Sequence, residues 1–305
     1  MRYAAVVLAW AAMLLEAQSP RLLRVPVWRE GDNGEAGGLA AAELRATVAG
    51  ASARVVRVLG PEDHLLVLLV LDMTEELSLA DLAREALGAE VRALPGHVYI
   101  AVLRAQDGLK VLVDPTSERE PVLRAIRELP VSGKAGLLES LPAALKLADA
   151  IQNRSAVRVA LLYVTDSNVY NYRDDYINPV VNWSDQHDLS RRFPEGLIKE
   201  KIARLHRQVT AYQTPLAIVH LNYRSDRVNE AYQSGLMQLS ASLGGSSQFC
   251  RSRHEIPQAL AAALTRLRRM HRVDLEAPPR RDGLVQVQIH TESGSLTYRD
   301  RFVLP

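Results

Sequence analysis

The sequence predicts an α/β fold whose centre is a doubly wound, mostly parallel sheet. A continuous apolar run at residues 65–71 and a mainly apolar run at residues 157–164 have the length and hydrophobicity of strands that are buried on both faces. Strand-like and helix-like segments alternate around these runs, which is typical of βαβ units. The composition, with 48% apolar and 24% charged residues in a chain of 305, is that of an ordinary globular protein.

The first segment has the features of a secretory signal. Arg2 precedes an apolar run over residues 4–15, and Ala17 follows as a permissive cleavage position. A membrane anchor is the alternative, but a run of about 12 residues is shorter than the roughly 20 that cross a bilayer. We therefore expect residues 1–17 to be a signal peptide. The mature chain is then secreted or periplasmic and has no transmembrane segment.

Strand-like segments flank the centre on both sides. Between residues 18 and 62, valine-rich stretches on either side of a glycine-rich bend indicate an N-terminal β-rich element. Over residues 272–305, polar and apolar side chains alternate before and after Gly294, which predicts a C-terminal β-hairpin that packs on the core. The α/β unit then spans residues 63–271.

Within this unit each expected element follows from its own pattern. The strand over 65–71 leads into a helix in which Leu79, Leu82 and Ala86 recur at helical spacing, and a Pro-Gly pair closes that unit. Later helices are predicted from the same period, and later strands from short apolar runs. The further strands are expected at 98–103, 109–113, 157–164, 216–221 and 247–249, and the helices at 78–87, 122–129, 137–151, 197–212, 228–243 and 256–270.

Charge and cysteine content argue against several classes of protein. The 37 basic and 35 acidic residues are interspersed and give a formal net charge of +2. The dense basic run at 266–272 fits a solvated helix end better than a nucleic-acid surface, so we expect no nucleic-acid partner. Cys250 is the single cysteine, so the chain cannot form an intrachain disulfide.

Common catalytic signatures are missing from the sequence. There is no Gly-x-Ser-x-Gly, no His-Glu-x-x-His and no Gly-x-Gly-x-x-Gly, and the eight histidines are scattered singly. We therefore name no catalytic residue and expect that the protein is not an enzyme.

Acidic residues end two of the predicted buried strands. Asp72 follows the strand over 65–71, and Asp166 follows the strand over 157–164. Ligands of open α/β sheets bind at the carboxyl ends of the strands, near the point where the strand order reverses. If these two strands are neighbours, their carboxylates lie side by side at one rim of the sheet.

Taken in order, these segments resemble the three loops of a von Willebrand factor A domain. The similarity rests on Asp-x-Thr after the first strand, on the segment 133–139 that opens a helix, and on the segment 161–166. The flanks are similar to a bacterial subfamily described as VWFA-related and common in Acidobacteria, so the resemblance covers about residues 22–305. It implies a metal-ion-dependent adhesion site, at which Mg²⁺ takes hydroxyl and carboxylate oxygens and one position receives an acidic side chain of a protein partner.

Carried over residue by residue, the adhesion-site pattern is incomplete. Asp72 and Thr74 match its first two ligands, and Asp166 matches the last. Glu76 stands where a serine is expected, and Ala135, which has no side-chain oxygen, stands where a threonine is expected. The resemblance implies a degenerate site with Asp72, Thr74, Glu76 and Asp166 as candidate ligands of Mg²⁺. The alternative is that both aspartates only cap the turns that follow them.

A long polar segment, residues 169–194, follows Asp166 and is rich in aromatic side chains. Loops of this length are often functional, and tyrosine and tryptophan supply much of the affinity of protein interfaces. Because the segment leaves the sheet at Asp166, we expect it to overhang the same rim. The alternative is that its rings only fasten the insertion to the domain. The candidate partner-binding residues are Tyr170, Tyr172, Tyr176 and Trp183.

The favoured hypothesis is a secreted or periplasmic protein-binding module, of adhesion or scaffold type, with a degenerate metal site. The sequence does not identify its protein partner. A structural envelope component with no discrete site is the first alternative. A metal-dependent hydrolase that uses Asp72, Glu76 and Asp166 is a less favoured one.

Overall fold

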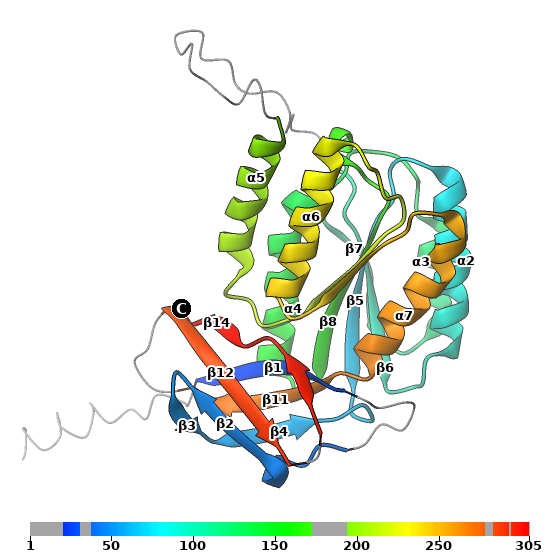
Figure 1. Cartoon of the computed structure of the whole chain (residues 1–305). Coiled ribbons are helices and arrows are strands. Elements are labelled where there is room, and N and C mark those ends of the chain that lie inside the picture. Colours follow the sequence, from blue (N-terminus) through cyan, green and yellow to red (C-terminus); the bar gives the residue numbers. More distant parts are fainter. Residues whose placement is uncertain (1–20, 31–37, 173–193, 278–282, 293, 305) are drawn as a thin grey trace, which may run out of the picture.

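The computed structural model describes residues 21–30, 38–172, 194–277, 283–292 and 294–304. An α/β unit stands on a smaller module made only of strands (Figure 1). Among the described residues, no helix combines the length and the apolar character that a bilayer crossing requires.

The α/β unit is built on a six-stranded sheet, in the order β10-β9-β8-β5-β6-β7. Every neighbouring pair is parallel except β6 and β7, which are antiparallel. This mostly parallel sheet confirms the predicted fold class. The strands are β5 (Leu65–Asp72), β6 (Val98–Arg104), β7 (Lys110–Thr116), β8 (Arg158–Thr165), β9 (Leu216–His220) and β10 (Ser246–Phe249).

Helices cover both faces of this sheet, as the sequence pattern predicts. One apolar cluster joins the sheet to α2 (Leu77–Ala93), α3 (Arg119–Glu128) and α7 (Ile256–Arg268). A second cluster joins the opposite face to α4 (Leu137–Arg154), α5 (Pro194–Val209) and α6 (Arg227–Ser242). Every residue of β5 and of β8 is buried, because both strands lie in the middle of the sheet with helices on either side.

The strand order reverses between β5 and β8. From β5 the chain continues outward through β6 and β7, whereas from β8 it continues in the other direction through β9 and β10. The two strands are direct parallel neighbours, with Asp72 opposite Thr165 in the register. Their carboxyl ends therefore form the switch point at which doubly wound folds bind ligands.

The β module is a sandwich of two four-stranded sheets, and strands from both flanks of the α/β unit contribute to it. One sheet has the order β13-β1-β11-β4 and the other β14-β12-β2-β3. The members are β1 (Leu22–Arg29), β2 (Leu44–Val48), β3 (Ala51–Ala53), β4 (Val55–Leu59), β11 (His271–Glu276), β12 (Gly283–Thr291), β13 (Leu296–Tyr298) and β14 (Arg301–Leu304).

The pairing of these strands differs from the expectation of two separate flanking elements. β1 pairs with β11, and β2 pairs with β12, so the N-terminal and C-terminal strands alternate. The segment after Gly294 is also divided: β13 pairs with β1, and only β14 completes a hairpin with β12. A single apolar core, with Leu23, Val273 and Phe302 among its members, fills the sandwich. The α/β unit is thus inserted between β4 and β11.

Side chains of the sandwich donate hydrogen bonds to carbonyl groups at the base of the α/β unit. Trp28 Nε1 donates to the carbonyl of Arg266 over 2.9 Å, in the last turn of α7. Arg299 donates to the carbonyls of Thr210 and Tyr212 over 2.6 and 2.7 Å, just beyond α5. The final carbonyls of a helix have no partner within the helix, so the sandwich satisfies groups that the α/β unit leaves open.

Candidate functional site

The structure brings the two strand-end aspartates together at the switch point. Asp72 is the last residue of β5, and Asp166 directly follows β8, its parallel neighbour. Both residues have no solvent-exposed surface. The two carboxylates thus lie side by side as expected, but neither is exposed at the surface of the rim.

Asp166 binds the loop that follows the other strand. Its Oδ1 accepts a hydrogen bond from the backbone N–H of Thr74 over 2.7 Å, and its Oδ2 accepts from those of Glu75 and Glu76 over 3.1 and 3.0 Å. These amides lie immediately before α2, where backbone N–H groups have no partner within the helix and negative charge is favoured. Asp166 thus satisfies the start of α2.

Asp72 does the same for α4. Its carboxylate accepts from the backbone N–H of Gly136 over 3.1 and 3.2 Å and from that of Leu137 over 3.2 Å. The hydroxyl of Tyr163 lies 3.4 Å from Oδ2, which is long for a hydrogen bond. The two carboxylates are therefore crossed. Asp72, at the end of β5, binds the start of α4, which leads into β8. Asp166, after β8, binds the start of α2, which follows β5.

Gly136 is required at its position by close packing. A Cβ atom on this residue would lie 2.0 Å from the carbonyl oxygen of Ala105, so any side chain would displace the loop. The preceding residue, Ala135, is buried and donates its N–H to the carbonyl of Asn171 over 2.8 Å. The loop before α4 is thus fixed between the sheet and the segment that follows Asp166.

Burial changes the acidity of Asp72. It raises the pKa of this carboxyl to about 7; the hydrogen bond from Gly136 opposes the rise, and the charge of Asp166 adds to it. Burial also raises the pKa of Tyr163 well above its ordinary value, so this phenol remains protonated beside Asp72.

Acidification is expected to stabilise the folded protein through Asp72. The pKa of this group is about 7 in the folded state and 3.8 ordinarily, so between these values the folded state binds more protons than the unfolded state. The contribution to the free energy of unfolding is highest at low pH and decreases as the pH rises through 7, by about 2.5 kcal/mol from pH 5 to pH 8. Urea unfolding of the wild type and of Asp72→Asn at both pH values measures it. If the free energy of unfolding depends on pH equally in the two proteins, the carboxyl of Asp72 does not titrate between pH 5 and pH 8.

The other candidate metal ligands are not directed at a common point. Glu76 accepts a hydrogen bond from the hydroxyl of Ser78 over 2.5 Å at the start of α2. Thr74 contributes its amide to Asp166, and its hydroxyl is buried with no hydrogen-bond partner among the described residues. Ala135 offers no ligand. Within the described ranges, no three histidine, cysteine, aspartate or glutamate side chains are grouped as a metal would need.

These residues do not fit the Mg²⁺ site that the resemblance implies. Mg²⁺ requires near-octahedral coordination by oxygen atoms, and the protein supplies some of them as carboxylates. Here five backbone amides already bind the oxygens of Asp72 and Asp166. A cation at this point would have to displace the amides that begin α2 and α4.

Glu75, and not Glu76, connects the rim to its surroundings. Its carboxylate accepts from Asn168 Nδ2 over 3.0 Å and forms an ion pair with Arg224, which follows β9. Burial raises the pKa of Glu75, and the hydrogen bond from Asn168 opposes that rise. The sequence analysis missed both Glu75 and Arg224, because two adjacent glutamates give no signal of which one turns toward the loop after β8.

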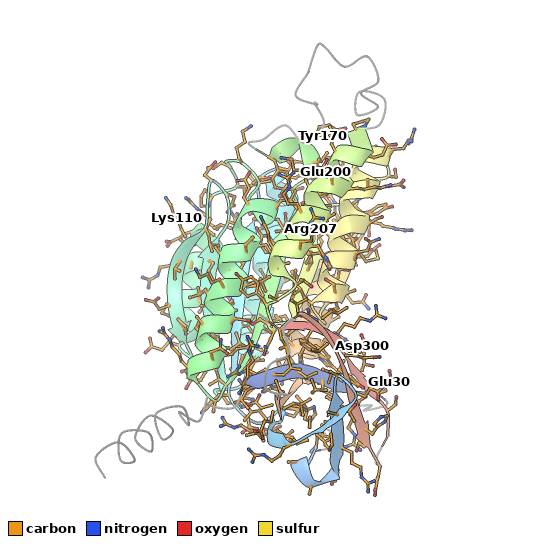
Figure 2. All side chains as sticks on the ribbon, turned by 90° about the vertical axis from the view of Figure 1, so that its left-hand side faces the viewer. Glu30, Lys110, Tyr170, Glu200, Arg207 and Asp300 are labelled. Carbon is orange, nitrogen blue, oxygen red and sulfur yellow. The ribbon has the colours of Figure 1, made fainter. Side chains whose placement is uncertain are left out.

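The aromatic candidates separate into different environments. Tyr170 is 55% exposed and lies at the end of the α/β unit opposite the sandwich (Figure 2). Tyr172 is 4% exposed, and its hydroxyl lies 2.6 Å from that of Tyr232, so the prediction that it binds a partner is wrong. It packs inside the unit as an anchor. Tyr176 and Trp183 lie outside the described residues.

The segment after Asp166 begins as an ordered turn and not as irregular chain. Residues Val169–Asn171 form a 3-10 helix. Asn168 Oδ1 accepts from the N–H of Tyr170 over 2.8 Å, and Asn171 Oδ1 accepts from the N–H of Asn168 over 2.7 Å. The N–H of Val169 donates to Asn229 of α6 over 3.0 Å. Tyr170 is thus an exposed ring on a fixed backbone.

His220 and Cys250 lie beneath the rim and are inaccessible. Burial lowers the pKa of His220 to about 4, and its Nε2 lies 2.9 Å from the carbonyl of Ser167. Cys250 is buried, and burial raises the pKa of its thiol to about 11. Both side chains are buried, so neither is accessible to a substrate in this conformation.

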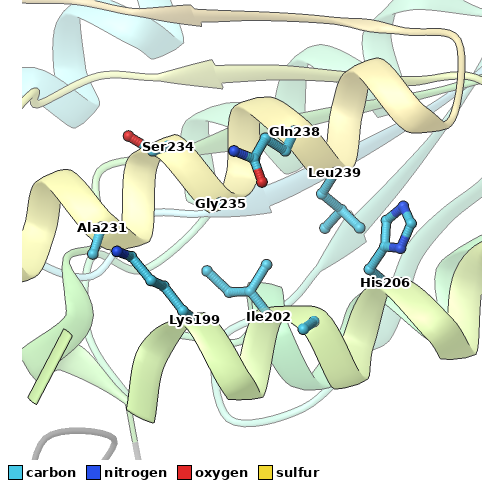
Figure 3. A pocket seen from close by; sticks show the side chains of 9 residues that line it. Lys199, Ile202, His206, Ala231, Ser234, Gly235, Gln238 and Leu239 are labelled. Atoms are coloured by element: carbon cyan, nitrogen blue, oxygen red, sulfur yellow. The ribbon is translucent and has the colours of Figure 1, made fainter. Parts of the chain in front are cut away.

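A hollow of about 350 Å³ lies between α5 and α6, away from the carboxylates (Figure 3). Ile202 and Leu239 lie in it, and polar side chains of Lys199, His206 and Gln238 line it. Neither Asp72 nor Asp166 lines this hollow, and neither do Glu75 and Tyr170.

No model of a known protein family matches the sequence, and no curated protein matches it either. Several solved structures are similar in fold. A von Willebrand factor type A protein from Catenulispora acidiphila has a TM-score of 0.47 and 10% identity over 94% of this chain and 74% of its own. The ArnB paralog VWA2 from Sulfolobus acidocaldarius has a TM-score of 0.44 and 9% identity over 93% and 74%. The conserved hypothetical protein BatB from Bacteroides thetaiotaomicron has a TM-score of 0.40 and 10% identity over 67% of this chain and 98% of its own.

Proposed function

We propose that this protein is a metal-independent protein-binding module, of adhesion or scaffold type, that acts through the rim at the switch point of its sheet. The crossed binding of Asp72 and Asp166 to the starts of α4 and α2 carries this proposal. Where a metal would hold the loops of an adhesion site, five backbone amides hold them here. Such a rim is preorganised before a partner arrives, which reduces the entropic cost of binding.

The groups that the rim offers to a partner are Tyr170 and the partly exposed pair of Glu75 and Arg224. Tyrosine and arginine are the side chains most enriched among residues that dominate binding energy. The fixed backbone at Asn168 and Val169 means that ordering Tyr170 costs little on binding. We further propose that the module works outside the cytoplasm, on the basis of the signal-like segment at residues 1–17.

Divalent cations are expected to leave the protein unchanged. Calorimetric titration of the mature protein with Mg²⁺, Mn²⁺ or Ca²⁺ should give no binding heat, and EDTA should not shift the melting temperature, since the carboxylate oxygens are already bound by amides. Thr74→Val serves as the control, because it removes a candidate ligand oxygen that has no hydrogen-bond partner among the described residues and leaves the amides bound to Asp166 in place. Saturable heat in the wild type would refute metal independence, and its loss in Thr74→Val would restore the adhesion-site mechanism.

Removal of the Tyr170 ring is expected to weaken partner binding about 10- to 100-fold. The wild type is immobilised and incubated, in EDTA, with envelope proteins of the cell that naturally makes this protein. Each retained protein is then purified, and its affinity is measured separately for the wild type, for Tyr170→Ala and for Leu284→Ala. Leu284 is 69% exposed on β12 of the sandwich and is the matched control. A partner bound equally by all three would place the interface elsewhere. A structural component without a discrete site would retain no such partner.

A further inference from the structure

The chain crosses twice between the sandwich and the α/β unit. It leaves the sandwich after β4 and reaches β5 through residues 60–64, and it returns from α7 to β11 through residues 269–270. Two crossings without other support would act as a hinge, because short connections between modules absorb changes of backbone angle. Both crossings pass beside the amino-terminal end of β8, which begins with Arg158.

Arg158 is fully buried and binds four backbone carbonyls: two in the first crossing, one at the end of α7 and one in the return crossing. Its Nη2 donates to Pro61 over 2.7 Å and to Asp63 over 2.6 Å. Its Nη1 donates to Arg268 over 2.8 Å and to Met270 over 2.7 Å. The backbone N–H of Arg158 also donates to the carbonyl of His64 over 2.9 Å. One planar guanidinium therefore joins both crossings to the amino-terminal end of the central strand β8.

A charged group at this position needs an explanation. Burying an ion is costly unless its donors are used, and an apolar residue would be the ordinary start of a buried strand. Both Nη atoms of Arg158 are used, whereas its Nε has no hydrogen-bond partner among the described residues. Burial lowers the pKa of Arg158 to about 10, and the nearby charges of Asp63 and Glu62 oppose the decrease, so the side chain stays a cation at neutral pH. The planar fork of arginine can bind several carbonyls at fixed directions, which the ammonium of lysine cannot do.

A second arginine, in β11 of the sandwich, binds the backbone next to Arg158. Arg272 of β11 forms a buried ion pair with Asp274, with both nitrogen to oxygen distances at 2.8 Å. It also donates to the carbonyl of Val157, the residue before Arg158. The return crossing is thus held on both sides of Met270.

We propose that Arg158 is a clamp that fixes the two crossings to each other and to the base of the central sheet, so that the sandwich and the α/β unit move as one rigid body. The rim then keeps a constant orientation relative to the sandwich. This inference does not depend on what the rim binds. If Arg158 is such a clamp, a substitution that removes its hydrogen bonds increases the mobility of both crossings at the same time.

The test compares full-length Arg158→Lys with Arg154→Lys, an exposed arginine at the end of α4. In Arg158→Lys, amide hydrogen exchange over residues 60–64 and 268–271 should increase together, about tenfold or more, while Arg154→Lys matches the wild type. Spin labels at Ser52→Cys in β3 and Ser234→Cys in α6 should give a narrow distance distribution in the wild type and a broad one in Arg158→Lys. Cys250 is buried and does not compete for the label.

Unchanged exchange in both crossings, or an increase in only one of them, would overturn the clamp. A distance distribution as narrow as that of the wild type would also overturn it. Should Arg158→Lys fail to fold, exchange of the wild type in increasing urea decides the matter. Both crossings must then open in one cooperative step, and separate opening contradicts the proposal.

Discussion

Asp166→Asn is expected to lower the free energy of unfolding by about 3–5 kcal/mol, among the largest effects of any single substitution in the described structure. The wild-type carboxylate accepts from three backbone amides, two of them on Oδ2. An asparagine keeps one acceptor oxygen and places an NH₂ group where the amides of Glu75 and Glu76 donate. The NH₂ group of the asparagine and the backbone N–H groups of Glu75 and Glu76 would then face each other as buried donors. The start of α2 would lose the acceptor that these amides have in the wild type. Urea unfolding monitored by circular dichroism measures the change.

The matched control for this substitution is Asp226→Asn. Asp226 also accepts from a backbone amide at the start of a helix, that of Asn229 in α6 over 3.0 Å, but it lies at the surface. Asparagine is as good as aspartate at an exposed cap, so this variant should cost less than about 1 kcal/mol. If both variants lose the same small amount, Asp166 is an ordinary cap and does not hold the rim together.

Residues 63–271 produced alone are expected to be largely unfolded, with a loss of at least about 5 kcal/mol relative to the whole chain. Removing the sandwich removes Trp28, which is 5% exposed and packs with the core of the α/β unit. It also removes the donors of Trp28 and Arg299 and leaves carbonyl groups beside α5 and α7 without partners. Since domains are stable by only about 5–15 kcal/mol, such a loss removes most of the margin.

Circular dichroism and thermal melting of the fragment, compared with residues 18–305, test this expectation. The longer chain keeps both flanks and should melt in one transition. A fragment that melts cooperatively at the temperature of the longer chain would show that the α/β unit is an independent domain.

The central fold was accessible from the sequence because its signal is local. The continuous hydrophobicity of β5 and the apolar centre of β8 indicated burial on both faces, and the period of the helices between them indicated a covered parallel sheet. The same reasoning placed Asp72 and Asp166 at one rim. The alternative that both aspartates cap turns anticipated bonds from backbone amides. It did not anticipate that Asp72 would bind the start of α4 and Asp166 that of α2, because this depends on how the loops before these helices approach each other in space.

Other features had no local signal at all. The composition of the segment after Asp166 suits both an interface and an internal anchor, and the structure places Tyr170 at the surface and Tyr172 in the interior. The alternation in β12 marked its buried side chains but not its neighbour β2, which lies far away in the chain. Arg158 stood at the edge of an apolar run with no mark of the four carbonyls around it.

The interleaving of the sandwich also constrains how the chain reaches its native state. Leu22 pairs with Glu276, so β1 waits during synthesis until the much later strand β11 has been made. Contacts so distant in sequence form slowly, and strands that wait expose unpaired edges that promote aggregation. The sandwich closes only when β11 and β12 are available, so the α/β unit gains the support of the sandwich late in synthesis.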